Sequence, residues 1–161
     1  LHPALQSQAG SVALLLVADH GQIAINPKTT IALNRLLPTL ESATRTSAAG
    51  KLLVPAGSRR DMFLYIKEDR LDEIAAGLAR ALSGRAEVHR TSDLIAAGIF
   101  GGEPGPTFLS RVGNLVVLPY AGETVWWDFG ERNKFDSNHR GAHGGLSREE
   151  ALTLLGALYY A

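Results

Sequence analysis

The sequence predicts an α/β fold, and three features of its 161 residues point to that class. Residues 12–17, VALLLV, form an apolar run of strand length, which is typical of a strand covered on both faces in a parallel sheet. Residues 61–99 alternate strand-like and helical patterns in the order β-α-β-α. The last third of the chain returns to short apolar runs, so strands and helices are interleaved along its length.

The composition is that of a globular protein, with 45% hydrophobic and 20% charged residues. Lys plus Arg and Asp plus Glu both total 16, so the formal charge is zero and predicts neither nucleic-acid binding nor a role at a membrane surface. The absence of cysteine excludes disulfides and thiolate metal sites and fits a cytoplasmic protein. The first residue is Leu1, without a basic signal-peptide region, so we expect a portion of a longer protein.

The first half of the chain after the opening strand is expected to alternate short elements and connectors. Residues 28–37 combine a short strand with a turn or helix, which Pro38 ends. Residues 41–50 are rich in Ser, Thr, Ala and Gly and predict a loop, and residues 57–60 predict a connector. Residues 61–67, DMFLYIK, predict a strand.

A helix is expected over residues 71–82, because helical spacing puts four apolar residues on one face. They are Leu71, Ile74, Leu78 and Leu82. Gly84 follows at a C-terminal cap position. Residues 86–90 predict a strand, Ser92 and Asp93 begin a helix to about Ile99, and the sequence GGEPGP from Gly101 predicts a turn.

The last third predicts two short strands, at residues 115–118 and 123–128, and a polar loop over residues 130–145. Ser147 and Glu150 fit a capping box, in which each side chain bonds to the other residue's backbone N–H. A closing helix is therefore expected from Arg148 to about Tyr159.

Asp19 and His20 stand directly after the first strand, and Gly21 gives the backbone freedom to turn there. Neighbouring side chains on a strand point to opposite faces, so both serve one site only where the strand has ended. Ligand sites of open α/β sheets lie at such carboxyl ends, and a carboxylate beside an imidazole suits Zn or Mn. The alternative is an Asp that caps the next turn beside a surface His.

His143 lies between glycines in GAHGG, which lets the backbone approach a ligand closely. The helix expected at Ser147 would turn its positive end toward an anion such as phosphate. The alternative is a flexible loop with an exposed His. We interpret His139 as secondary or solvated, His89 as structural, and His2 as part of a frayed end.

The adjacent Trp126 and Trp127 are expected to form one core contact and one edge contact, or else a stacking surface for a flat substrate group. Arg111, Arg132 and Arg140 are candidates for phosphate contacts, although scattered arginines are usually solvated.

Taken together, LLLVADHG and the later GAHGGLSREE resemble motifs of the type I phosphodiesterase and nucleotide pyrophosphatase family in the alkaline phosphatase superfamily. In that family an Asp-His pair after a strand binds one of two metals, and a G-x-H-G histidine binds the other. The resemblance therefore implies that Asp19 and His20 are ligands of one metal and His143 of the second. Residues 111–117 resemble the family's R-x-G-D-x-V strand entry, with Asn114 where Asp is common.

The resemblance implies a portion of an alkaline-phosphatase-like sheet-and-helix core, formed by residues 1–56 and 109–161. Residues 57–108 would then be an inserted small α/β, cap-like subdomain. The family's nucleophilic Thr or Ser and its Asp-x-x-x-His ligands have no counterpart here, so no catalytic nucleophile is assigned to this chain. Alone, it is expected to bind metal weakly and to be inactive.

The resemblance also implies the activity of the full-length parent. We expect metal-dependent hydrolysis of phosphodiester or pyrophosphate bonds in nucleotide-type substrates, with two divalent ions, Zn or Mn. Each histidine must be neutral to bind metal, so activity should fall below about pH 6. Asp19, His20 and His143 should meet at one sheet edge.

Two alternatives stay open. One is a phosphomonoesterase, phosphomutase or sulfatase-like member of the same superfamily, which shares the metal motif. The other is a non-catalytic binding or interaction module in which the Asp-His pair is only a turn. The expected partner is a small phosphoester or nucleotide, with no membrane or nucleic-acid partner, and an unpaired sheet edge would allow homo-oligomers.

Overall fold

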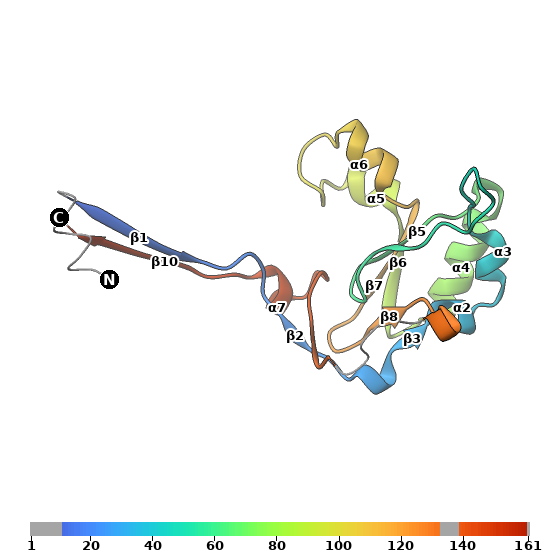
Figure 1. The fold of residues 1–161 in the computed structure, drawn as a ribbon, viewed down its shortest axis with the longest axis horizontal. Helices are drawn as coiled ribbons and strands as arrows, with labels where there is room; N and C mark the ends of the chain where they lie inside the picture. The colour runs from blue at the N-terminus through green and yellow to red at the C-terminus, as the bar shows by residue number, and fades with distance from the viewer. Residues whose placement is uncertain (1–10, 133–138, 161) are drawn as a thin grey trace.

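The computed structural model describes residues 11–132 and 139–160 and confirms a mixed α/β fold. Figure 1 shows a compact body from which a two-stranded ribbon extends to one side. The helices of the described residues are α2 (Leu33–Leu36), α3 (Thr39–Ala43), α4 (Leu71–Ala81), α5 (Thr91–Ala96), α6 (Pro106–Arg111) and α7 (Arg148–Ala151). Short 3-10 turns are η1 (Pro27–Thr29), η2 (Glu68–Arg70) and η3 (Gly130–Arg132).

The strands form one four-stranded sheet and three separate pairs. The sheet contains β4 (Ala56–Gly57), β5 (Met62–Leu64), β7 (Leu115–Pro119) and β6 (Ala86–Arg90), in that order and antiparallel throughout. The pairs are β1 (Val12–Val17) with β10 (Leu155–Tyr160), β2 (Ile23–Ala24) with β9 (Gly141–Ala142), and β3 (Ile31–Ala32) with β8 (Val125–Trp126). Only the β3–β8 pair is parallel among these.

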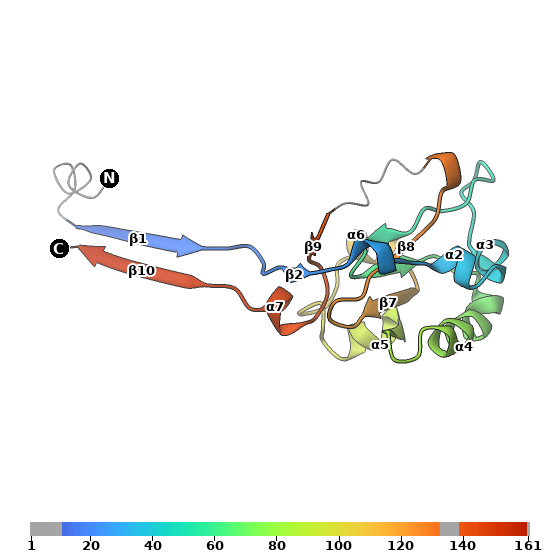
Figure 2. The ribbon, with the colours of Figure 1, turned by 90° about the horizontal axis from the view of Figure 1, so that it is seen from below.

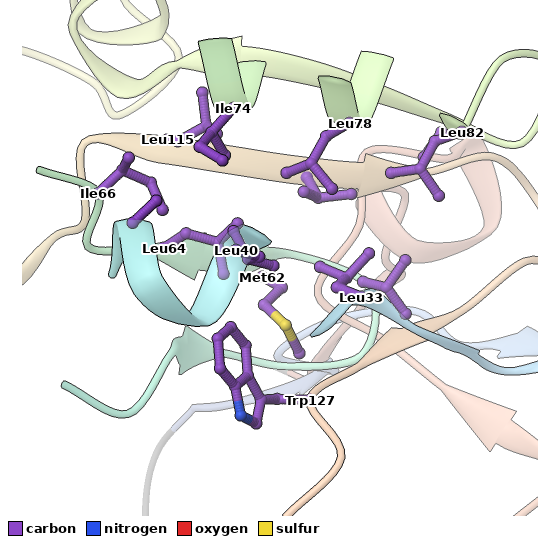
Figure 3. Packing of buried hydrophobic residues seen from close by; sticks show 14 of the residues in the cluster. Leu33, Leu40, Met62, Leu64, Ile66, Ile74, Leu78, Leu82, Leu115 and Trp127 are labelled. Carbon is purple, nitrogen blue, oxygen red and sulfur yellow. The ribbon is translucent and has the colours of Figure 1, made fainter. Parts of the chain in front are cut away.

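The core lies between helix α4 and the sheet. Leu71, Ile74, Leu78 and Leu82 are buried, as their helical spacing predicts. Figure 3 shows Ile74 and Leu78 directed from α4 toward the layer that holds Leu115. Gly84 follows the helix with φ of 74°, which is the left-handed conformation that glycine adopts at a helix end.

Strand β1 forms where the sequence predicts it, but its environment differs from the prediction of a buried parallel strand. It pairs antiparallel with β10, from Val12 opposite Tyr160 to Val17 opposite Leu155. Figures 1 and 2 show that this ribbon extends away from the body. Leu15 is 63% exposed and Tyr159 is 71% exposed. The apolar run correctly indicated extended backbone, whereas burial depends on partners that a run of residues does not specify.

The closing helix predicted from Arg148 to Tyr159 is wrong beyond its first turn. Helix α7 ends at Ala151, and Leu152 is extended with ψ of 131°. The Thr153 hydroxyl donates to the Ala18 carbonyl at 2.7 Å, and β10 then pairs with β1 along its length. The leucines in this segment are spaced in a way that fits both a helix and a strand. Pairing with β1 provides the backbone hydrogen bonds that a helix would otherwise form within itself.

Smaller differences concern the connectors. Helix α6 occupies the region after the predicted GGEPGP turn and begins at Pro106, a residue suited to the first helical position. Helix α3 covers the start of the predicted loop 41–50.

The division into a core and an insert at residues 57 and 109 stays a prediction. Strand β7, which belongs to the predicted core, lies in the same sheet as β5 and β6 of the predicted insert. No helix in the described ranges is long and apolar enough to cross a membrane.

Candidate metal centre

Asp19 and His20 lie just beyond the end of β1, where the chain turns toward the body. The backbone N–H of His20 donates to Asp19 Oδ1 at 3.0 Å, and His20 Nδ1 lies 2.7 Å from the Gly21 carbonyl oxygen. Gly21 N–H donates to the Glu150 carbonyl at 2.9 Å. A Cβ at Gly21 would overlap the carbonyl oxygen of Glu149, so only glycine allows the turn to pack this closely against α7.

His143 lies directly after β9, which pairs with β2 so that Ala142 is opposite Ile23. This pairing brings together two segments from opposite ends of the chain. The rings of His20 and His143 stack with their centroids 3.7 Å apart and their planes 16° apart. Asp19 Oδ2 lies 3.5 Å from His20 Nε2. The structure therefore places the three residues singled out in the sequence in one cluster.

Ser58 and Asp61 support the backbone at His143, although the sequence predicts only a connector at Ser58 and the start of a strand at Asp61. Ser58 Oγ donates to Asp61 Oδ1 at 2.5 Å and lies 3.2 Å from the His143 carbonyl oxygen. Gly144 has φ of 109°, and a Cβ there would lie 2.8 Å from Ser58 Oγ. Burial raises the pKa of Asp61, and the hydrogen bonds from Ser58 oppose this rise only in part.

Arg60 and Glu150 form a buried ion pair beneath the same loop. The guanidinium donates from Nε to Glu150 Oε1 at 2.8 Å and from Nη2 to Oε2 at 2.7 Å. Its Nη1 donates to the carbonyls of Tyr120 and Glu123. Both side chains of the pair are 1% exposed. This bidentate pair joins α7 to the body of the protein.

The Glu150 carboxylate also holds the loop that follows His143. It accepts hydrogen bonds from Gly145 N–H at 3.0 Å and from Ser147 Oγ at 2.7 Å. Burial alone would raise the pKa of Glu150, but the hydrogen bonds from Arg60, Ser147 and Gly145 outweigh it and lower the pKa to about 2. The predicted capping box is wrong in detail, since Ser147 makes no side-chain cap bond to the helix backbone.

Asn114 has a structural role that explains the amide at this position. Its Oδ1 accepts from Ile66 N–H at 2.8 Å, and its Nδ2 donates to the Ile66 carbonyl at 2.7 Å. Nδ2 also lies 3.0 Å from Glu68 Oε1. An ionised Asp has no donor for these two acceptors, so the amide suits this junction between β5 and β7.

The other candidate side chains lie elsewhere. Trp127 is buried in the hydrophobic core, as Figure 3 shows, and the Trp126 ring meets Phe129 edge-on at 6.5 Å. This arrangement matches the structural interpretation of the tryptophan pair. His89 Nε2 contacts Glu87 Oε2 at 2.8 Å on β6. Arg140 and His139 are exposed. His2 and the side chain of Arg132 lie outside the described part.

The donor chemistry fits divalent cations, since carboxylate and imidazole are usual ligands of Zn and Mn. The number of donors is lower than such a cation requires. Among the residues that the structure describes, no group of three or more His, Asp or Glu is arranged to hold a metal ion. The cluster of Asp19, His20 and His143 is thus an incomplete set, and the ligand role of each residue stays a prediction.

The chain is similar to known proteins over most of its length. The sequence pattern of the family described as type I phosphodiesterase / nucleotide pyrophosphatase matches residues 1–146. No curated protein sequence matches the chain. Human ectonucleotide pyrophosphatase / phosphodiesterase 5 superimposes with a TM-score of 0.61 at 15% identity, over 90% of this chain. The murine protein of the same name gives 0.63 at 18% identity over 91% of this chain, both alone and as an inactive variant in complex with AMP.

These likenesses establish the fold. In each case the match covers 33% of the solved chain, so this chain spans about a third of the length of those structures.

Proposed function

This chain belongs to the type I phosphodiesterase / nucleotide pyrophosphatase family, and from that premise we propose a function for the whole protein. It hydrolyses phosphodiester or pyrophosphate bonds of nucleotide-type substrates with two divalent cations, Zn or Mn. Asp19 and His20 are ligands of one cation, and His143 is a ligand of the other. The observation that carries the proposal is the stacked pair of His20 and His143, which the β2–β9 pairing brings together.

The residues of this chain have defined tasks in the proposal. Asp19 and His20 extend from the end of β1, so that a carboxylate and an imidazole meet at one edge of the fold. The Arg60–Glu150 pair holds the glycine loop after His143 and so sets where that imidazole lies. When bound, the cations neutralise charge that develops on the phosphate oxygens. We assign the nucleophile to no residue here, so the chain alone should not turn over substrate.

The test is an assay of the full-length protein on a chromogenic phosphodiester, with a monoester and a sulfate ester for comparison. Asp19→Ala and His143→Ala should each lower kcat/KM by more than the roughly 10- to 100-fold that loss of an outer ligand partner costs. His89→Ala is the matched control, since His89 pairs with Glu87 on β6 and should leave activity unchanged.

Retained activity in both variants would remove these residues from the site. Faster turnover of the monoester or sulfate ester would move the protein to another activity of the superfamily. If the full-length protein neither binds zinc nor cleaves any of these esters, the chain belongs to a non-catalytic binding module.

A further inference from the structure

The turn between strands β4 and β5, residues 58–61, lies against the candidate metal centre. The strand register places Gly57 opposite Met62, so the four residues between them form a tight hairpin turn. Gly57 has φ of 84°, and a Cβ there would lie 1.9 Å from the Asp61 carbonyl oxygen. Only glycine therefore lets the turn close this tightly, and the turn forms a well-defined tip of the four-stranded sheet.

Within this turn, the Ser58 hydroxyl is held from two sides. Its Oγ donates to Asp61 Oδ1 at 2.5 Å and accepts from the Arg60 backbone N–H at 3.1 Å. The backbone N–H of Ser58 also donates to Asp61 Oδ1, at 2.8 Å. The Asp61 carboxylate thus binds both the backbone and the side chain of Ser58. A hydroxyl bound as donor and acceptor at once keeps a single orientation.

This fixed hydroxyl packs against the backbone of the His143 loop. Ser58 Oγ lies 3.2 Å from the His143 carbonyl oxygen. Gly144 follows with φ of 109°, and a Cβ there would lie 2.8 Å from Ser58 Oγ and 2.9 Å from Asp61 Oδ1. The contact therefore leaves no room for a side chain at position 144. The Ser–Asp pair contacts residue 143 itself, whereas the buried ion pair beneath the loop holds the residues that follow.

The position of this backbone determines where the His143 imidazole lies. The imidazole stacks on that of His20 with the ring centroids 3.7 Å apart, a spacing at which the rings are in van der Waals contact. Metal–ligand distances are defined to within about 0.2 Å. A small displacement of the backbone would therefore separate the rings and move the imidazole out of reach of a cation.

We propose that Ser58 and Asp61 are positioning residues, which place the His143 imidazole for stacking on His20 and for binding the second cation. They act through the backbone of residues 143 and 144. The four-stranded sheet thereby sets the geometry of the candidate metal centre through its β4–β5 turn. The part that concerns the cation rests on the proposed function, whereas the placement of the ring is a property of this chain alone.

The first experiment is NMR of the histidine ring signals of the chain without metal, at about pH 8, where imidazoles are normally neutral. Ser58→Ala should shift the ring signals of His20 and His143 together, because each stacked ring loses the ring-current shift caused by the other. The His89 signal should stay unchanged, since His89 pairs with Glu87 on β6. Ser58→Thr keeps the hydroxyl and should restore the parent signals.

Further variants keep the test independent of folding. Asp61→Ala releases the Ser58 hydroxyl and should give the same shifts, whereas Asp61→Asn keeps Oδ1 as an acceptor and should give the parent signals. Ser92→Ala is the matched control, because it removes a hydroxyl that donates to the neighbouring Asp93 at an exposed position. Urea denaturation of each variant shows that it is folded under the conditions of the NMR measurement.

The second experiment is zinc titration of the full-length protein in competition with a chromogenic chelator. Ser58→Ala and Asp61→Ala should each weaken one of two zinc sites by about tenfold, the lower end of what loss of an outer partner of a metal ligand costs. The affinity of the site with Asp19 and His20 should stay unchanged. A loss of stability alone would not select one zinc site, and Ser58→Thr should restore the affinity.

The outcomes separate this proposal from the proposed function. If His143→Ala keeps both zinc ions, or the full-length protein binds none, the proposed function fails and the ring signals alone decide the positioning. If His143→Ala loses one ion while Ser58→Ala binds both as tightly as the parent, the positioning proposal is overturned. Unchanged His20 and His143 signals in Ser58→Ala and Asp61→Ala, or equal shifts in Ser92→Ala, would overturn it as well.

Discussion

Arg60 and Glu150 hold the loop that follows His143. Both are buried, and the carboxylate reaches Gly145 N–H as well as the guanidinium. Breaking such a pair leaves an uncompensated buried charge, which costs about 3–5 kcal/mol. Removing both side chains leaves no uncompensated buried charge. We therefore expect the pair to contribute more to the position of the loop than to the free energy of unfolding.

Arg60→Met should therefore lower the free energy of unfolding by about 3–5 kcal/mol, and Arg60→Met/Glu150→Leu should recover part of that loss. Recovery is partial because Gly145 N–H loses its acceptor, the Glu150 carboxylate, and the Glu123 carbonyl loses its donor, the Arg60 guanidinium. Urea denaturation at neutral pH measures both. Arg70→Met is the control, because water screens the more exposed Arg70–Glu73 pair and its loss should change stability little.

The same variants should also differ in how their free energy of unfolding depends on pH. The pKa of Glu150 falls from 4.5 to about 2 on folding, so its stabilisation is present above 4.5 and is lost as the pH falls toward 2. Asp61 has the opposite effect on the pH dependence of stability. Because its pKa is raised in the folded protein, protonation of this carboxyl at low pH favours the folded state. The double variant should lose the Glu150 component of the acid dependence. An unchanged acid dependence, or a double variant less stable than Arg60→Met, would contradict this account of the pair.

Sequence reasoning found the residues whose signal is local. Asp19 and His20 follow an apolar run, and His143 lies between glycines, so each is visible within a few positions. Arg60 and Glu150 are separated by 90 positions, and nothing near either residue indicates the other. Ser58 and Asp61 were missed for the same reason, since their contact with the His143 loop exists only after folding.

Among the elements, the β1–β10 ribbon is exposed on both faces. Opposed residues share a face, so Leu14 and Leu158 lie on one side, whereas Leu15 and Tyr159 lie on the other. All four are exposed by more than two fifths. Apolar surface of this kind usually marks an interaction site. We propose that this ribbon mediates self-association of the isolated chain.

Leu15→Lys/Tyr159→Lys should shift the isolated chain from an oligomer to a monomer, because charge on the ribbon opposes burial of its apolar face. Sedimentation velocity measures the change. Leu52→Lys, at an exposed leucine on the body, is the control and should leave the oligomer intact. A parent chain that sediments as a monomer at all concentrations would contradict the proposal.

The ribbon also shows where element prediction succeeds and fails. Helix α4 was predictable because four leucine and isoleucine positions recur at helical spacing and one face is buried. Residues 152–159 contain leucines at spacings that fit a helix or a strand, and the choice depends on pairing with β1 at the other end of the chain. The identity of a distant partner is not encoded in the local period.

At the scale of the whole molecule, the fold brings together two motifs that are far apart in the sequence. The β2–β9 pairing joins residues near the start to residues near the end, and the stacked imidazoles lie at that junction. The family membership and the mixed α/β fold were predictable, because the two motifs carry the resemblance. The contact between the rings was expected only through that resemblance, since two motifs this far apart have no local geometry in common.

The most direct test of the central claim is the metal content of the full-length protein, measured by native mass spectrometry after zinc loading. The account predicts two zinc ions per chain, one lost in Asp19→Ala/His20→Ala and the other lost in His143→Ala. His89→Ala should keep both. If the variants at Asp19, His20 and His143 retain the full zinc content of the parent, these residues are not the ligands and the claim fails.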